Sequence, residues 1–262
     1  MEFFAISNGI PVHISDTKKG EKTIILLHGY LETLYIYSEF QELLSKRYRV
    51  ISIDLPGHGL SGSSKDVNSM EFSAKVVAGV LDVCKVEKAF VAGHSMGGYI
   101  AQNCMKLFPD LFEGLILLNS TPYADTDEKK KLREKEIEVI LQANLGKITA
   151  ISIPQMFSPD NLRLFDDKIE ETIEIAETHD PNGIVSCLKG MMQRDDNLQF
   201  LKSLDKLLLV FGDKDKYISN EVRDGIIKEL PNAVSVIIPS SGHCSFVEQP
   251  QLVEEAMASF IG

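Results

Sequence analysis

The sequence has few cysteines, and none of them form a C-x-x-C pair. Its four cysteines are Cys84, Cys104, Cys187 and Cys244. Such wide spacing argues against a disulfide scaffold, a zinc ribbon or a thioredoxin-like motif, and it favours free thiols in a reducing compartment. No cluster of histidine and cysteine has the spacing of metal ligands. We therefore expect a cytoplasmic protein with no metal and no cofactor.

Long hydrophobic runs and excess positive charge are also missing. No run approaches the roughly 18 apolar residues that suggest a membrane span. The first four residues, Met1-Glu2-Phe3-Phe4, lack the basic region and long apolar core of a signal peptide. Acidic residues outnumber basic ones by 38 to 27, which gives a net charge of −11. This balance argues against nucleic acid or an anionic membrane as the main partner.

What is present is an ordinary globular composition with a regular alternation of strand and helix patterns. The 262 residues, 44% of them hydrophobic, suit one large domain or a domain with an insertion. Apolar runs predict strands at 3–6, 10–14, 23–27, 50–53, 89–92, 115–118, 207–211 and 234–238. Helical spacing predicts helices at 40–44, 70–84, 96–107, 221–230 and 246–260. Alternation of this kind indicates an α/β fold with a mostly parallel central sheet and helices on both faces.

The alternation stops between about residues 121 and 196, where no buried strand pattern occurs. This stretch opens with a charge run at 125–138, which we interpret as the solvated face of a helix. Further helical pieces follow, separated by prolines. We expect residues 1–120 and 197–262 to form the core, with 121–196 inserted into it as a helical segment.

The most informative motif is the pentapeptide Gly93-His94-Ser95-Met96-Gly97. It follows an apolar strand pattern and precedes a helical one, which is the context that the G-x-S-x-G nucleophile elbow requires. Its glycines remove clashes around a serine held on a sharp, strained turn. We therefore predict that Ser95 is a nucleophile.

A serine hydroxyl needs a base and a group that orients the base. In open α/β sheets, reactive groups collect at the carboxyl ends of the strands. Two loops qualify, because each follows a late strand: 212–215, which contains Asp213 and Asp215, and 239–243, which ends in His243. The order serine, acid, histidine is the one expected for this architecture.

With His28-Gly29 after an early strand and Asp54-Leu55-Pro56-Gly57-His58-Gly59 after the next, these motifs make the chain resemble the α/β-hydrolases that carry a helical cap. The resemblance covers essentially the whole chain. It implies that 121–196 is the cap or lid. It also implies, from the family's G-x-x-D pattern, that Asp215 and not Asp213 completes the triad.

The resemblance and the chemistry together assign roles at the site. Ser95 would attack an acyl carbonyl, His243 would take its proton, and Asp215 would orient the imidazole. The backbone N–H groups of Tyr30 and Met96 would form the oxyanion hole.

The remaining predictions concern the substrate. Phe157, Met191 and Met192 are candidates to line an acyl pocket, the alternative being ordinary cap core. We expect hydrolysis of a carboxylic ester of a small, largely apolar substrate by a monomer or homodimer. Two alternatives stay open. One is C–C bond hydrolysis, or a lyase reaction like that of the menaquinone-pathway synthase. The other is a small-molecule receptor that retains the triad.

Overall fold

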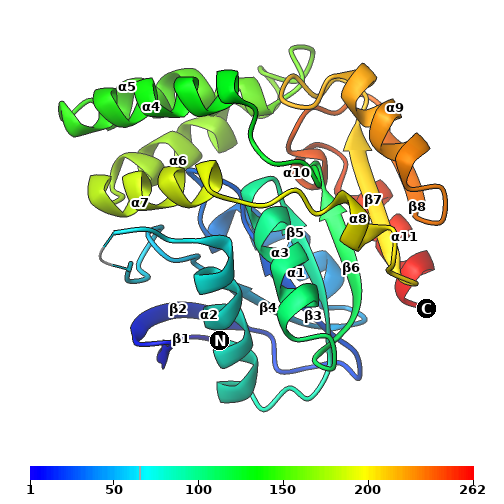
Figure 1. Ribbon diagram of the computed structural model, residues 1–262. Coiled ribbons are helices and arrows are strands. Elements are labelled where there is room, and N and C mark those ends of the chain that lie inside the picture. Colours follow the sequence, from blue (N-terminus) through cyan, green and yellow to red (C-terminus); the bar gives the residue numbers. More distant parts are fainter. Residues whose placement is uncertain (65) are drawn as a thin grey trace.

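The computed structural model describes residues 1–64 and 66–262, and these form an eight-stranded sheet flanked by helices (Figure 1). The strands are β1 (Glu2–Ser7), β2 (Ile10–Asp16), β3 (Thr23–Leu27), β4 (Arg49–Ile53), β5 (Ala89–His94), β6 (Phe112–Leu118), β7 (Leu207–Gly212) and β8 (Val234–Ile238). Their order across the sheet is β1-β2-β4-β3-β5-β6-β7-β8. β2 pairs antiparallel with both β1 and β4, and the other neighbouring pairs are parallel. The predicted fold class is confirmed.

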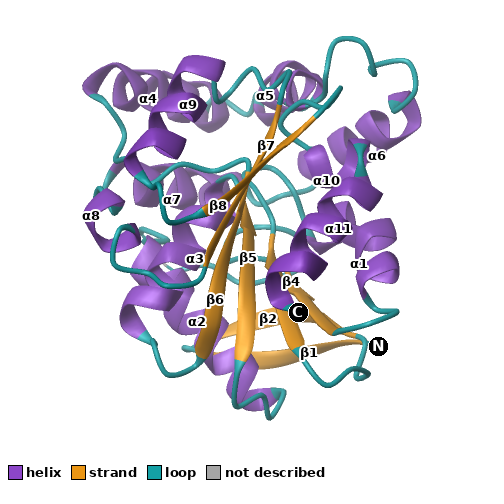
Figure 2. Ribbon diagram, turned by 90° about the vertical axis from the view of Figure 1, so that its right-hand side faces the viewer, coloured by secondary structure: helices purple, strands orange, loops and turns teal. Residues whose placement is uncertain are grey.

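Helices cover both faces of this sheet (Figure 2). They are α1 (Ser38–Leu44), α2 (Met70–Val83), α3 (Met96–Leu107), α4 (Asp127–Leu141), α5 (Leu145–Ser152), α6 (Asp166–Glu177), α7 (Pro181–Met192), α8 (Leu198–Leu201), α9 (Asn220–Glu229), α10 (Ser245–Glu248) and α11 (Pro250–Ile261). Among the described residues, no helix combines the length and the apolar character that a membrane crossing would need.

The central strands bury side chains on both faces, which explains their unbroken apolar runs. In β3, Ile25 and Leu27 join the core shared with α2 and α3, whereas Ile24 and Leu26 join the core shared with α1 and α11. All four side chains are fully buried. The sheet is therefore a rigid support between two hydrophobic layers, and its strand ends are held in fixed positions.

The single helix predicted over 246–260 is wrong, because the structure divides this stretch into α10 and α11. The break lies at Gln249, whose backbone is not helical (φ −140°), and α11 begins at Pro250. Proline has no N–H to donate and its ring crowds the preceding turn, so it starts a helix more readily than it continues one.

Residues 121–196 contain four α-helices and no strand, as predicted, and Figure 1 shows α4 to α7 above the carboxyl ends of the strands. The chain enters and leaves this segment at neighbouring points, because Asn197 N–H donates to Pro122 O at 2.8 Å. Within the segment α4 packs on α7 and α5 packs on α6. The helices thus form a layer over the edge of the sheet where reactive loops gather.

Candidate active site

Ser95 occupies a strained turn between β5 and α3. Its φ is +49°, a left-handed conformation that non-glycine residues rarely adopt. Its N–H donates to Leu118 O at 3.0 Å, which ties the turn to the neighbouring strand. A side chain at Gly97 would collide with the backbone oxygens of Leu27 and His28. The local sequence is therefore the one that lets the serine sit at the tip of β5.

The loops after β7 and β8 bring an acid and a base together. His243 Nδ1 lies 2.8 Å from Asp215 Oδ2, and both residues are buried. Asp215 Oδ1 accepts hydrogen bonds from the backbone N–H groups of Tyr217 (2.7 Å) and Ile218 (3.0 Å). Burial raises the pKa of Asp215, but His243 and the hydrogen bonds from Asn119 and Ile218 outweigh it, so the pKa lies below its usual value. Asp215 is therefore held as a carboxylate.

Asn119, just beyond β6, reinforces this pair and was not predicted from the sequence. Its side-chain amide donates to Asp215 Oδ2 at 2.9 Å and to Gly242 O at 3.1 Å. Its oxygen accepts from Ser245 Oγ at 2.6 Å. The only signal in the sequence was its position at the carboxyl end of a strand between the strands that carry the serine and the acid.

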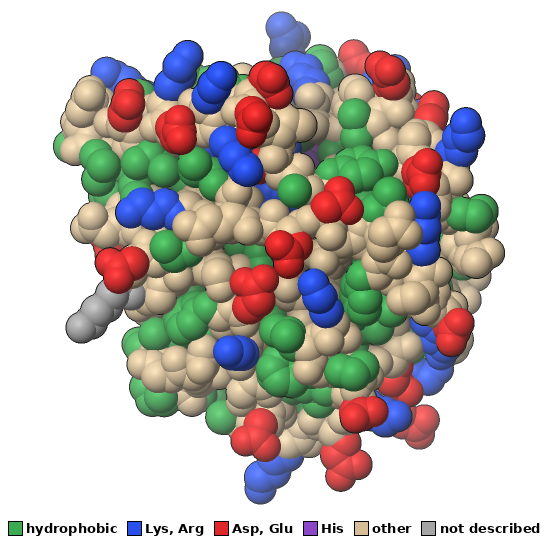
Figure 3. All heavy atoms as spheres, in the orientation of Figure 1, with side chains coloured by type: hydrophobic (Ala, Val, Ile, Leu, Met, Phe, Trp, Pro, Cys, Tyr) green, Lys and Arg blue, Asp and Glu red, His purple; other side chains and the backbone are tan. Residues whose placement is uncertain are grey.

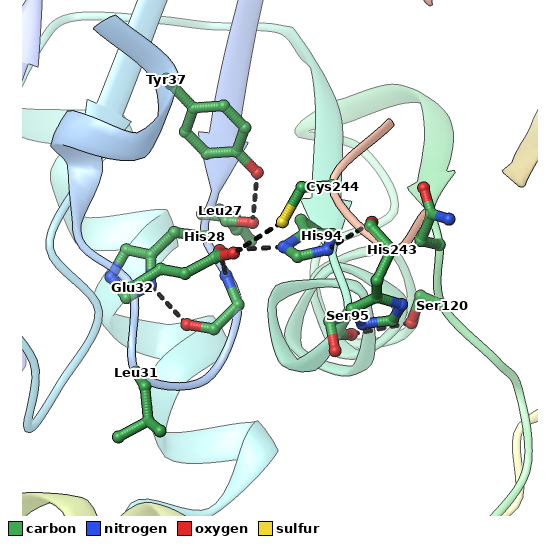
Figure 4. Close-up of polar contacts among 12 residues, drawn as sticks. Leu27, His28, Leu31, Glu32, Tyr37, His94, Ser95, Ser120, His243 and Cys244 are labelled. Carbon is green, nitrogen blue, oxygen red and sulfur yellow. Dashed lines mark hydrogen bonds and ion pairs between the residues drawn. The ribbon is translucent and has the colours of Figure 1, made fainter. Parts of the chain in front are cut away.

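Ser95 and His243 open into one cavity of about 270 Å³ beneath the inserted helices. Its lining comprises Tyr30, His94, Ser95, Tyr99, Asn119, Thr121, Lys129, Leu132, Arg133, Glu136, Ser152, Met156, Met191, Tyr217, Ile218 and His243. Figure 4 shows the side chains of Ser95 and His243 close together, although no hydrogen bond joins these two described residues. Catalytic hydrogen bonds are often loose before substrate binds.

Of the two predicted oxyanion donors, Met96 directly follows this serine and Tyr30 lines the same cavity. Met96 is the first residue of α3, where N–H groups are unpaired within the helix and the helix dipole favours negative charge. Tyr30 lies in the loop after β3 and lines the cavity. That loop is braced by His28, which bonds Gly29 O through Nδ1 (2.7 Å) and accepts from Leu55 N–H through Nε2 (2.9 Å). Burial lowers the pKa of His28, which suits this neutral, one-donor pattern.

Behind the serine lies a buried cluster of Glu32, His94 and Cys244 (Figure 4). Glu32 Oε2 lies 2.9 Å from His94 Nδ1 and also accepts from Gly29 N–H. The Cys244 thiol donates to Glu32 Oε1 at 3.6 Å, and His94 Nε2 lies 3.0 Å from the carbonyl oxygen of His243.

These are ligand types that a metal could use, and one ligating atom from each lies within 4.8 Å of the others. However, the three side chains already satisfy one another by hydrogen bonding. Burial also raises the pKa of the Cys244 thiol well above its usual value, which disfavours the thiolate that binds metals. The cluster instead joins the loop after β3, the elbow and the histidine loop.

Most of 125–138 is exposed, as predicted for a solvated helix face, but one side of α4 also forms a charged upper wall of the cavity. Lys129, Arg133 and Glu136 of α4 line the cavity, and only 11% of the Arg133 side chain is exposed. Acidic and basic side chains gather along α4 in Figure 3. Arg133 Nε donates to Asp125 Oδ2 at 2.6 Å, and the Tyr30 hydroxyl donates to Glu136 Oε1 at 2.7 Å.

Of the three predicted pocket residues, the structure places only Met191 on the cavity wall. Met156, which was not among the predicted residues, also lines the cavity, and its carbonyl oxygen accepts from His243 N–H at 2.6 Å. The next residue, Phe157, lies outside the lining and packs on Phe165 with ring centroids 5.9 Å apart. Met192 follows Met191 on α7 and is therefore turned by about 100° from the cavity-facing side.

Comparisons with known proteins agree with this architecture. A family model described as alpha/beta hydrolase fold matches residues 22–250. The uncharacterized hydrolase YugF of Bacillus subtilis is 27% identical over 92% of this chain and 90% of its own length. A 2-hydroxy-6-oxononadienedioate/2-hydroxy-6-oxononatrienedioate hydrolase of Paraburkholderia phymatum is 26% identical, with coverage of 96% and 91%. A thermophilic esterase from Thermogutta terrifontis, solved with malate bound, superimposes with a TM-score of 0.93 at 26% identity, covering 100% of this chain and 98% of its own.

Proposed function

Because this chain belongs to the alpha/beta hydrolase fold family, we propose that it is a serine hydrolase that cleaves a carboxylic ester through an acyl-enzyme. Ser95 is the nucleophile, His243 the general base and acid, and Asp215 the group that orients the imidazole. The observation that carries this proposal is the Asp215–His243 pair, whose histidine lines the same cavity as a serine with strained backbone geometry.

The reaction follows from these positions. Ser95 Oγ attacks the acyl carbon while His243 accepts the hydroxyl proton, and the N–H groups of Tyr30 and Met96 stabilise the oxyanion. The bond to the leaving alcohol then breaks as His243 returns the proton to it. Water attacks the acyl-enzyme in the second half, again losing its proton to His243, which restores the Ser95 hydroxyl and releases the acid. None of these steps needs a cofactor.

The substrate is small, and residues 121–196 act as the cap that bounds it. Apolar atoms contributed by Leu132, Met156, Met191 and Ile218 suit an acyl chain. Because charged residues of α4 also line the pocket, it is amphipathic and not wholly apolar as predicted.

C–C bond hydrolysis is the second candidate, supported by the relatives named for 2-hydroxy-6-oxo-dioate substrates. A carbon leaving group would be protonated where the alcohol is protonated in ester cleavage.

A fluorophosphonate probe and a substrate panel test the proposal. We expect covalent labelling at Ser95 and turnover of short esters, with one 2-hydroxy-6-oxo dienoate in the panel to detect C–C hydrolysis. Ser95→Ala should abolish labelling and lower turnover on the order of 10⁴-fold, because triad members act as a unit.

Ser152→Ala is the matched control, since Ser152 lines the same cavity without a histidine partner in the described structure. It should still be labelled at Ser95. Labelling that survives Ser95→Ala would identify another nucleophile. Tight binding of esters without turnover would instead support the receptor alternative.

A further inference from the structure

Two cations of α4 face the cavity that contains Ser95. Lys129 and Arg133 are four residues apart, so they project from the same side of the helix. Arg133 is largely enclosed, with 11% of its side chain exposed. Enclosing a charged guanidinium in this way costs folding free energy unless anionic groups bind to it. The groups that pair with Arg133, and those that are missing, therefore indicate which kind of ligand the cavity binds.

The carboxylates present do not balance these cations. Asp125 lies between two guanidiniums, 2.6 Å from Arg133 Nε and 2.8 Å from Arg194 Nη1. Within the described residues, the Arg133 guanidinium makes its hydrogen bonds to Asp125 through Nε alone. Its two terminal amino groups are therefore available to a ligand, and they form the planar fork that matches a carboxylate.

Glu136 is the remaining acid on this wall, and its carboxyl group already has a hydrogen-bond partner. Its Oε1 accepts from the Tyr30 hydroxyl, and Arg133 lies nearby. Burial raises the pKa of Glu136, which opposes its ionised form. Even with Glu136 ionised, Arg133, Arg194 and Lys129 face only two carboxylates, so the wall keeps an excess of positive charge.

The surroundings of Tyr99 show which charge dominates on its side of the cavity. The Arg194 Cζ atom lies 3.8 Å from the centroid of the Tyr99 ring. Burial raises the pKa of the Tyr99 hydroxyl, yet Arg194, Lys129 and Arg133 lower it below its usual value. The side of the cavity next to Tyr99 is thus electropositive, in a chain whose net charge is −11.

We propose that this cavity selects acyl substrates that bear a carboxylate at the end remote from the scissile bond, such as hemiesters of short dicarboxylic acids. The proposal rests on the serine hydrolase function proposed above. Arg133 holds the free carboxylate, Lys129 at the mouth attracts it, and the apolar wall contacts the chain between. Water adds across the ester bond at Ser95, the alcohol leaves, and a dicarboxylate is released.

Three ethyl esters of matched length test this selectivity: monoethyl adipate, ethyl hexanoate and ethyl 6-aminohexanoate. Release of ethanol gives kcat/KM for each. We expect monoethyl adipate to be preferred to the ammonium ester by at least about tenfold. Arg133→Gln should lower kcat/KM for monoethyl adipate by about 10- to 100-fold, as expected for a charge-assisted hydrogen bond, and change that for ethyl hexanoate by less than about threefold.

Further variants separate recognition from folding, because Arg133 also bonds Asp125. Arg133→Lys keeps the charge but loses the fork, so its selectivity should lie between those of the parent and Arg133→Gln. Lys129→Gln alters an exposed side chain and should lower selectivity by about twofold to fivefold. Lys131→Gln, an exposed lysine of α4 outside the cavity lining, is the matched control and should leave the ratios unchanged.

Binding separates failure of this inference from failure of the proposed chemistry. Adipate should raise the melting temperature of the Ser95→Ala protein, and Arg133→Gln in that background should remove the effect. If no ester is cleaved and no probe labels Ser95 while adipate still binds through Arg133, the hydrolase proposal fails and anion recognition stands. Unchanged ester ratios in both Arg133→Gln and Lys129→Gln, or a preference for the ammonium ester, would overturn the inference.

Discussion

Replacing Glu32 with glutamine tests the buried cluster behind Ser95. The carboxylate is 1% exposed and lies 2.9 Å from His94 Nδ1. Burial raises the pKa of Glu32, but the neighbouring His94 and the hydrogen bond from Gly29 outweigh it and leave the pKa lowered. Glu32 is therefore ionised. Glutamine has nearly the same shape, so the substitution removes the charge without leaving a cavity.

The expected loss of stability follows from the contacts that the Glu32 carboxylate makes. His94 contacts an acceptor through each ring nitrogen, the Glu32 carboxylate through Nδ1 and the carbonyl of His243 through Nε2. Leaving a buried polar group without its hydrogen-bond partner typically costs about 1–3 kcal/mol. For a domain of roughly this size, 1 kcal/mol corresponds to about 2–4 °C, so Glu32→Gln should lower the melting temperature by about 2–12 °C.

Thermal and urea unfolding, followed by circular dichroism, measure this loss. Glu39→Gln, on the exposed side of α1, is the matched control and should stay within about 0.5 kcal/mol of the parent. The double variant with His94→Gln should lose clearly less than the sum of the single losses, because the two residues contact each other. A loss below about 1 kcal/mol for Glu32→Gln would refute the reasoning, since it would mean that the carboxylate is not an essential partner of His94.

Two further predictions concern pH and the triad. Burial is the main cause that lowers the pKa values of His28, His58 and His179. Their rings form a row in space, because His28 contacts His58 and His58 contacts His179. Below about pH 6.5 the unfolded chain therefore binds protons that the folded chain does not, and stability should fall by roughly 1–3 kcal/mol between pH 7.5 and 5.5. Urea unfolding at the two pH values checks this, and equal or greater stability at pH 5.5 would contradict it. Asn119→Ala removes a hydrogen bond to the buried acid, so kcat should fall about tenfold or more with little change in KM; steady-state kinetics on one ester decide, and a change confined to KM would place Asn119 in substrate binding instead.

Most of the fold could be predicted because its signals are local. Strands buried on both faces read as unbroken apolar runs, and the turn at Asn8-Gly9 marks the hairpin of β1 and β2. The ends of individual strands were predicted less accurately. β6 begins at Phe112, three residues before its predicted start, because exposed Glu113 and small Gly114 interrupt the apolar pattern.

The candidate triad could be predicted for a related reason. Parallel strands place their carboxyl ends at one edge, so residues that follow them meet even when they are distant in the chain. That catalytic role stays a prediction until Ser95 is tested. Glu32 gave no such signal, since it bonds a residue 62 positions away and no motif links the two.

The charged cavity wall could not be predicted either. Sequence spacing shows that Lys129 and Arg133 share one side of α4, but not whether that side faces solvent or a cavity. Only the packing of α4 over the strand ends settles the question. Phe157 and Met192 show a second limit of prediction from the sequence. Hydrophobic character alone does not distinguish a residue of the pocket wall from one in the core of the inserted helices.

The bond between Tyr30 and Glu136 has a consequence for how substrates are admitted. Tyr30 belongs to the loop that supplies a proposed oxyanion donor, whereas Glu136 belongs to α4. We expect a molecule too bulky for the space beneath α4 to push that helix outward, and such a movement would break the 2.7 Å contact. The loop then loses one of its anchors at the moment when the donor is needed. A poorly fitting molecule is therefore penalised twice, once in binding and again in the rate of the chemical step.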